Sequence, residues 1–406
     1  MIKYYISKKL EDCCGCKACE QVCAKKAISF IVNDEGFEYP QIDTDACVNC
    51  GLCEQVCPIV KSDDIKYASG VAFAAQNINQ QDIMKSSSGG AFVALAKVIL
   101  EKGGLVYGAA FDTGPYVKHT RVDNIEDIEK LMGSKYVQSD INTTYQQAKR
   151  DLQDGKWVYF TGTPCQIAGL RLFVGKEYDN LLTSDLVCHG TPSPAIFANT
   201  VNHMAENLRK KFVGYSFRDK KIHGWSCSSS SSSWEKDGKQ CYIKYSKDME
   251  AYFKAFISGD LMRMNCYSCP FATNERVSDI TLADYWGARR LHPEFPETHK
   301  GVSLVIVNTR KGEKFFNMIE SRMFIMPINL DDAVRNNHNL SHPTPLTNAR
   351  NESYKLAFTA YDSFVSRYNH SIYIKEKCKV EVEYIVRKYP LLFKICSKIS
   401  KLIKKE

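Results

Sequence analysis

The feature that most constrains this chain is a cysteine pattern that occurs twice within its first 60 residues. Each run has the spacing C-x2-C-x2-C-x3-C, and the second run is followed by Pro58. Three closely spaced thiolates can bind one face of an iron–sulfur cube, while the fourth cysteine is turned toward a neighbouring cube. The expected ligands of two [4Fe-4S] clusters are therefore Cys13, Cys16, Cys19 and Cys57 in one set, and Cys47, Cys50, Cys53 and Cys23 in the other.

Two other kinds of cysteine site fit this pattern less well. Structural zinc usually takes its four thiolates from two C-x2-C pairs, whereas this chain has two complete four-cysteine runs. A radical enzyme that uses S-adenosylmethionine would need C-x3-C-x2-C, which neither run provides. Between the runs, two β-rich segments flank a polar turn at 33–36, as a ferredoxin hairpin would. We therefore expect a bacterial-type dicluster ferredoxin domain over residues 1–60.

The composition leaves room for a much larger globular body after this unit. The chain has 406 residues, of which 44% are hydrophobic and 25% charged. Its start has no apolar signal region, and a chain of this length does not need disulfides for stability. We therefore interpret the 17 cysteines as thiols and ligands in a reducing cytoplasm. No apolar stretch approaches the roughly 20 residues needed to span a bilayer, so an integral membrane protein is not expected.

The net charge of +8 is concentrated at the C-terminal end. Residues 387–406 hold seven Lys or Arg against one Glu, which is +6, and the remaining +2 does not indicate a nucleic-acid partner. A helix over this segment would carry leucines and isoleucines on one face and lysines on another. Such a helix could lie peripherally on an anionic membrane surface, dock on an acidic protein partner, or pack on its own domain.

Beyond a polar linker, alternating strand and helix patterns indicate a mixed α/β body. The expected strands are 71–76, 104–111, 157–160 and 301–308, and the expected helices are 91–104, 125–132 and 312–320. From about residue 351 the composition is helical to the end. The expected fold is therefore α+β, with units at 1–60, 67–150, 151–350 and 351–406.

Four of the nine remaining cysteines stand in settings typical of metal ligands. Cys165 and Cys188 each follow an apolar run, and Cys266 and Cys269 form a C-x2-C pair. Together they would supply four thiolates for a third cluster, if the fold brings them into one place. Buried core cysteines and a zinc site remain alternative explanations.

A serine- and glycine-rich segment, residues 86–90, directly precedes a strongly apolar helix. Small residues there let backbone N–H groups approach a phosphate, and a helix N-terminus favours an anion. Ser and Gly are also common N-caps, so the segment alone indicates little. Lys135 could supply positive charge to the same anion, and neither segment fits the G-x-G-x-x-G or P-loop pattern.

Seven segments, taken in order, resemble the coenzyme F420 hydrogenase/dehydrogenase beta-subunit family. They are SSSGGAF (86–92), GSKYVQS (133–139), GTPCQIAGL (162–170), CHGTPSP (188–194), FRDK with GW (217–225), CYSCPF (266–271) and SDITLADYWG (278–287). Seven ordered matches are far more specific than any single one. The resemblance implies a mixed α/β flavoprotein core, usually with FAD, that holds a cluster close to the flavin.

The same resemblance implies roles for individual residues. The ligands of a third [4Fe-4S] cluster would be Cys165, Cys188, Cys266 and Cys269, with His189 as a packing or hydrogen-bonding neighbour. The flavin-site candidates are Ser88, Gly89, Gly90, Ser134, Lys135 and Tyr136. Asp284, Tyr285 and Trp286 would line the flavin cavity, although aromatic residues in an apolar setting are often only core.

The resulting functional hypothesis is an FAD-dependent iron–sulfur oxidoreductase. Electrons from a ferredoxin-like or other low-potential donor would reach FAD through [4Fe-4S] clusters, and FAD would reduce an organic small molecule. The family resemblance suggests a deazaflavin-like acceptor or, by analogy with bacterial members, a substrate of surface-polysaccharide synthesis. The alternative is an electron-relay or adaptor subunit of a larger redox complex, without its own substrate.

Overall fold

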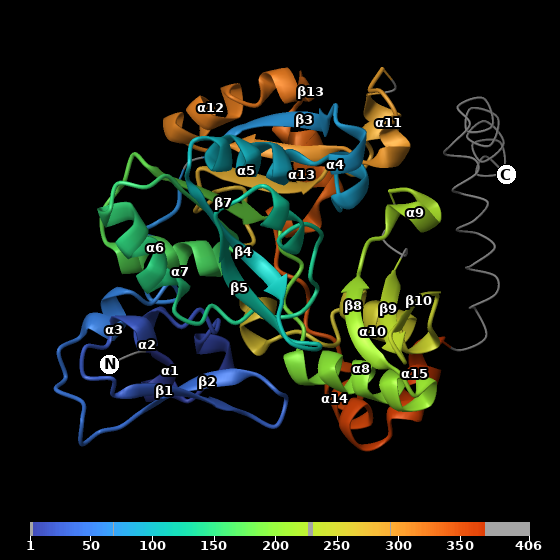
Figure 1. The fold of residues 1–406 in the computed structure, drawn as a ribbon. Coiled ribbons are helices and arrows are strands. Elements are labelled where there is room, and N and C mark those ends of the chain that lie inside the picture. Colours follow the sequence, from blue (N-terminus) through green and yellow to red (C-terminus); the bar gives the residue numbers. More distant parts are fainter. Residues whose placement is uncertain (1–2, 68, 226–229, 293, 370–406) are drawn as a thin grey trace, which may run out of the picture.

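A small N-terminal domain and a larger mixed α/β body make up the structure, a computed structural model that describes residues 3–67, 69–225, 230–292 and 294–369 (Figure 1). This arrangement confirms the expected α+β class, with a ferredoxin-like unit first and helices last. The basic helix expected over 387–406 lies outside the described residues. None of the described helices is long and apolar enough to cross a membrane.

The N-terminal domain is built around one β-hairpin. Its elements are α1 (Lys3–Ser7), η1 (Leu10–Asp12), α2 (Ala18–Val22), β1 (Ile28–Val32), β2 (Glu38–Ile42) and α3 (Leu52–Gln55). The two strands pair antiparallel, as the sequence predicts, and the Phe37 amide closes the turn by donating to Asn33 Oδ1 at 2.9 Å. Gly36 has φ +80°, and a Cβ there would lie 2.2 Å from the Ala195 Cβ, so both the turn and its packing on the larger body require glycine.

One eight-stranded sheet forms the centre of the larger body. Its order is β13-β3-β12-β11-β7-β6-β4-β5. The strands are β3 (Val71–Asn77), β4 (Leu105–Phe111), β5 (Val117–Val122), β6 (Val158–Gly162), β7 (Leu181–Leu186), β11 (Ile280–Asp284), β12 (Ser303–Val307) and β13 (Met323–Pro327). The central strands β4, β6, β7 and β11 run parallel, and the outer pairs are antiparallel. All five residues of β12 are buried, as expected for a strand covered on both faces.

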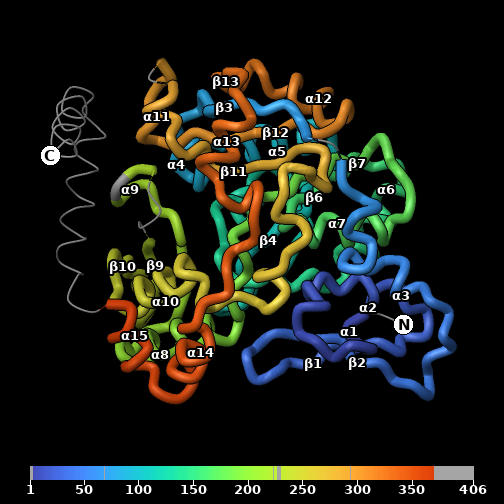
Figure 2. Tube along the Cα trace, turned by 180° about the vertical axis from the view of Figure 1, so that it is seen from behind, coloured from blue at the N-terminus to red at the C-terminus, as the bar shows by residue number. Residues whose placement is uncertain are grey.

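Helices cover both faces of this sheet, and the N-terminal domain packs on one of them. On one face lie α5 (Ala91–Glu101) and α12 (Arg310–Asn317). On the other lie α6 (Thr144–Gln153) and α7 (Pro164–Val174), whose apolar core also includes Cys14, Cys16 and Ala18 of the N-terminal domain. Seen from behind, the N-terminal domain lies directly against α6 and α7 (Figure 2). The two domains therefore share a core and are in direct contact.

A second, smaller sheet and four helices form a separate lobe that the sequence patterns did not distinguish. The lobe contains β8 (Lys211–Ser216), β9 (Ser231–Lys236), β10 (Lys239–Lys244), α8 (Pro194–Leu208), α10 (Lys247–Ile257), α14 (Arg350–Thr359) and α15 (Tyr361–Asn369). Its core is aromatic: the rings of Phe197, Phe217 and Tyr252 contact one another, and the buried Trp234 contacts Phe212. The described start of the predicted helical tail is therefore packed in this lobe.

The remaining short elements connect these layers. They are α4 (Gln80–Lys85), η2 (Glu126–Lys130), α9 (Lys220–His223), η3 (Met264–Ser268), α11 (Ala288–Leu291), η4 (Thr298–Lys300), η5 (Glu320–Arg322), α13 (Leu330–Asn336) and η6 (His338–Leu340). The strands and helices expected from the sequence are found within a few residues, except that 125–132 forms only the short 3₁₀ helix η2. Ile125, Ile128 and Leu131 recur every three residues, which fits the three-residue turn of a 3₁₀ helix better than an α-helix.

Candidate functional site

A cavity of about 470 Å³ opens where the parallel strands end. The carboxyl ends of β6, β7 and β11 contribute Gly162, Leu186 and Asp284 to its wall. The segment before α5 and the segment 131–137 also line it, together with residues 188–191, the end of α10 and residues 336–339. Ligand sites of open α/β sheets are found at this edge, so its position favours a binding function.

The structure brings most of the predicted flavin-site residues together in this cavity. Its wall includes Ser88, Gly90, Ser134, Lys135, Tyr136, Asp284 and Trp286. Gly89 lies behind the wall, where a Cβ would come 2.3 Å from the Ala75 carbonyl oxygen and 2.4 Å from the Ser303 amide nitrogen. Tyr285 is fully buried in an apolar cluster behind α11. Gly89 therefore allows the loop to lie on the sheet, and Tyr285 belongs to the core.

The serine- and glycine-rich loop is held from three sides. Gly90 has φ +85° at the start of α5, a conformation that favours glycine. The Ser134 amide donates to Ser87 Oγ at 2.7 Å, which joins this loop to the segment of Lys135. The buried Lys220 Nζ donates to the Ile83 carbonyl at 2.7 Å and also to the Ser88 carbonyl. The loop is therefore fixed before any ligand binds.

Lys135 presents a half-buried ammonium group to the cavity. Its Nζ donates to the carbonyl oxygens of Lys130 and Met132 at 3.1 and 2.8 Å. Within the described part of the chain, no acidic side chain lies within ion-pair distance of it. Burial lowers its pKa to about 7, so the amine is close to half protonated at neutral pH. An anionic group in the cavity would stabilise the charged form.

A second wall of the cavity combines a fixed carboxylate with aromatic rings. Arg218 donates to both oxygens of Asp284, at 2.6 and 3.2 Å, and Trp225 Nε1 donates to Asp284 Oδ1 at 2.6 Å. The rings of Trp225 and Trp286 stack at 5.1 Å with an angle of 4°. Arg218 was not singled out from the sequence, although it stands in the FRDK segment. Sequence reasoning could have predicted its role from Asp284, because a buried carboxylate needs a cation as its partner.

His119 and His189 also border the cavity, and neither carries a free ring nitrogen. His119 contacts Ser139 Oγ at 2.6 Å and the Thr161 carbonyl at 3.0 Å, and burial lowers its pKa to about 4. It is therefore neutral at physiological pH. His189 contacts Asn339 Oδ1 at 3.2 Å and the Ile257 carbonyl at 3.1 Å, consistent with the expected hydrogen-bonding neighbour.

Cys165, Cys188, Cys266 and Cys269, the core cysteines, converge beside the cavity, and Cys188 is part of its wall. Burial, followed by the nearby thiols of Cys266, Cys165 and Cys269, raises the pKa of Cys188 well above its usual value. Burial and the thiols of Cys165 and Cys266 raise the pKa of Cys269 to about 12. The fold therefore gathers half-buried thiols from three segments of the chain at one place.

Four half-buried thiols whose charged forms are destabilised fit a site that a metal cluster would complete, because a bound cluster compensates the thiolate charges. As the side chains stand, no three His, Cys, Asp or Glu groups of the described residues are positioned to hold a single metal ion. The thiols lie near one another without being in ligating geometry. Their assignment as cluster ligands stays a prediction.

The N-terminal cysteines of the two expected sets lie near one another, and their division into two ligand sets stays a prediction. Burial, together with the thiols of Cys13, Cys57 and Cys53, raises the pKa of Cys19 well above its usual value. Cys23, Cys47 and Cys53 pack around a neighbouring apolar cluster, and Cys50 is exposed to solvent. The set that contains Cys50 therefore faces outward.

Cys14 was assigned no role from the sequence, yet it lies where the two cysteine groups meet. It is buried, and its thiol interacts first with the thiol of Cys16 and then with that of Cys165. The contact with Cys16 and burial raise the pKa of Cys14 well above its usual value, whereas the contact with Cys165 lowers it. No sequence signal marks it, because it is one more cysteine inside a run.

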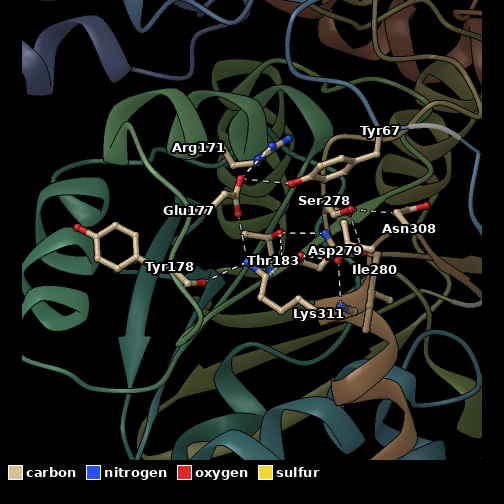
Figure 3. A network of polar contacts seen from close by, with 12 residues as sticks. Tyr67, Arg171, Glu177, Tyr178, Thr183, Ser278, Asp279, Ile280, Asn308 and Lys311 are labelled. Carbon is tan, nitrogen blue, oxygen red and sulfur yellow. Dashed lines mark hydrogen bonds and ion pairs between the residues drawn. The ribbon is translucent and has the colours of Figure 1, made fainter.

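A smaller cavity of about 260 Å³ lies at the C-terminal end of α7, and a network of charged residues lines it (Figure 3). Glu177 pairs with both Arg171 and Lys311, at 3.3 and 3.4 Å. Asp279 accepts from the Thr183 amide at 2.9 Å and from its hydroxyl at 2.8 Å. Because these groups already satisfy one another, the network joins β7 to β11 and α12 and has a structural role.

Comparisons with known proteins identify two parts of the chain. Residues 155–332 match the family of the C-terminal part of the coenzyme F420 hydrogenase/dehydrogenase beta subunit, and residues 12–60 match the 4Fe-4S dicluster domain. A chain in a structure of the F420-reducing [NiFe] hydrogenase complex from Methanosarcina barkeri is 16% identical, over 76% of this chain and 91% of that chain, with a TM-score of 0.41. The search of curated proteins found no match. The family matches confirm the resemblance drawn from the seven segments.

Proposed function

Because the chain joins a 4Fe-4S dicluster domain to a domain of the coenzyme F420 hydrogenase/dehydrogenase beta-subunit family, we propose that it is an iron–sulfur flavoprotein oxidoreductase. It would take electrons from a low-potential donor and deliver them in pairs to an organic acceptor. The observation that carries this proposal is the cavity, in which separate segments of the chain converge beside Cys188. A redox cofactor bound there would lie next to the core cysteines.

Three cysteine sets would hold [4Fe-4S] clusters in this proposal. They are Cys13, Cys16, Cys19 and Cys57; Cys23, Cys47, Cys50 and Cys53; and Cys165, Cys188, Cys266 and Cys269. Bound clusters would supply one-electron transfer. The protein supplies burial, neighbouring charges and backbone donors, such as the Thr191 amide that donates to Cys266 Sγ at 3.4 Å.

Three features of the cavity support FAD binding. Small residues at the start of α5 leave backbone N–H groups accessible to a phosphate, and the helix N-terminus favours its negative charge. Tyr136 and Trp286 offer aromatic surface for a planar ring system. Lys135 Nζ would hold or release a proton near neutral pH, because its pKa is lowered to about 7. These residues support a flavin and leave the identity of the acceptor to be determined.

For the acceptor we propose a deazaflavin-like molecule or a biosynthetic substrate, possibilities that rest on the family alone. A deazaflavin is the first compound to assay, and sugar-linked precursors of surface polysaccharides are the second. In either case the acceptor must reach the cavity, whose wall contains the exposed side chain of Leu186.

The test is the cofactor content of the anaerobically purified chain. The protein is denatured, and the released flavin and iron are quantified per chain. About one FAD per chain, with iron present, would support the proposed oxidoreductase. Absence of flavin from a chain with intact iron–sulfur absorption would refute the assignment as a flavoprotein and favour the electron-relay role.

A further inference from the structure

Arg263 lies at the junction between the N-terminal and core cysteine sets. It directly precedes η3, the short helix that carries Cys266, and its side chain reaches back into the N-terminal domain. Only 1% of its surface is exposed. The guanidinium group is therefore a buried positive charge between two groups of thiols.

The contacts of this guanidinium group are neutral. Nε donates to the Cys13 carbonyl at 2.7 Å, and Nη2 donates to the Glu38 carbonyl at 2.9 Å and lies 3.5 Å from Cys13 Sγ. Nη1 donates to Gln138 Oε1 at 3.2 Å, and the group stacks 4.0 Å from the ring of Tyr39. Among the described residues, no Asp or Glu side chain forms an ion pair with Arg263.

Two other buried arginines show that this is unusual in the fold. Arg276 pairs with Asp185 at 3.1 Å, and Arg350 pairs with Glu35 at 2.5 Å. Burying a charge without a partner is costly, so a counter-charge is expected near Arg263. The ionisable groups that face it include the thiols of Cys13, Cys14 and Cys266 and the phenol of Tyr39, with Cys165 and Tyr4 also within electrostatic reach.

Four of these groups are cysteines, three of them assigned as ligands of two different clusters. A [4Fe-4S] centre held by four thiolates is negatively charged, and its one-electron reduction adds one more negative charge. A fixed cation beside it stabilises the reduced form and raises the reduction potential. Cys14 interacts with both Cys16 and Cys165, so it lies at the same junction between the N-terminal and core cysteine sets.

We propose that Arg263 is the fixed counter-charge of this junction and raises the reduction potential of the centre held by Cys13. This inference rests on the proposed function and adds a residue that sets the order of electron transfer. An electron from the low-potential donor would be drawn from the outward-facing set of Cys50 toward the set of Cys13, beside the core. In this step the cluster held by the set of Cys50 loses one electron, the cluster held by the set of Cys13 gains it, and no bond is broken.

The charge-neutral variant Arg263→Gln should make reduction of one centre about tenfold less favourable. For a one-electron couple this corresponds to about 59 mV toward lower potential. Arg263→Lys keeps the charge and should retain a wild-type potential. Arg350→Gln is the matched control, because it also breaks a contact between the two domains but removes a charge that does not face the cysteines.

The measurement is a redox titration of the anaerobically purified full chain, followed by EPR, with iron quantified in every variant. A lowered potential in Arg263→Gln alone supports the proposal. Unchanged potentials in Arg263→Gln with full iron content, or an equal shift in Arg263→Lys, would overturn it. If Arg263→Gln loses iron, Arg263→Lys decides, since loss there too assigns Arg263 a structural role only. Failure of the proposed function is read separately, as absence of flavin or iron from the wild-type chain.

Discussion

Replacing Arg276 by methionine should destabilise the larger body and disturb the core cysteine site together. Arg276 is 1% exposed and Asp185 is fully buried, so the variant leaves a buried carboxylate without its cation. Breaking a buried pair in this way costs about 3 to 5 kcal/mol, which is a large part of the about 5 to 15 kcal/mol that stabilises a folded protein. The larger body has about 300 residues with an unfolding entropy of about 2.1 cal/mol/K each, so the melting temperature should fall by about 5 to 8 °C.

The same arginine also positions the segment that follows the core C-x2-C pair. It donates to the carbonyl oxygens of Phe271 and Thr273 at 3.1 and 2.8 Å, and to the Leu186 carbonyl at 2.9 Å. Its loss should therefore release Cys269 from Cys188 and reduce the iron content by about four atoms per chain, the content of one [4Fe-4S] cluster.

The assays are thermal unfolding and iron analysis under anaerobic conditions. Arg322→Met is the control, because Arg322 pairs with Glu101 at the surface and its loss should cost about 1 kcal/mol or less. The double variant Arg276→Met with Asp185→Leu should recover stability, since replacing both partners removes the unpaired charge. A fall no larger than that of the control, or no recovery in the double variant, would refute this reasoning.

Three further predictions concern the cavity and its cysteines. Trp286→Ala should lose bound flavin on purification. Its control is Trp157→Ala, which should retain flavin because Trp157 packs on Phe315 away from the cavity. Equal flavin content in the two variants would contradict the placement of the flavin. Anion affinity of the cavity should decrease as the pH rises through about 7, because Lys135 loses its proton there, and titration calorimetry on Lys135→Met should show no such dependence. Cys188→Ser should lose about four iron atoms per chain and keep the spectrum of the dicluster domain; unchanged iron would exclude it as a ligand.

Much of the N-terminal domain and of the central sheet follows from local sequence. Two kinds of signal depend on neighbouring residues only: the polar turn before Phe37 and the apolar runs of β3, β4, β6 and β12. The structure contains the hairpin and all four strands. The lobe of β8 to β10 was missed because its aromatic core unites segments more than 100 residues apart, from Phe197 to Phe364. The roles of Arg218 and Arg263 were missed for a related reason, since each is defined by its partners in space.

The convergence of the core cysteines has a simple geometric basis that local sequence does not reveal. In the parallel pair of β6 and β7, Gly162 lies opposite Asp185, and Cys165 and Cys188 each follow these residues by three positions. Parallel strands end at the same edge, so the register places both thiols there. Cys266 and Cys269 come from a segment outside the sheet and depend on Arg276, which joins that segment to the end of β7. The cysteine site should therefore tolerate changes in the cavity loops and be sensitive to changes in this arginine.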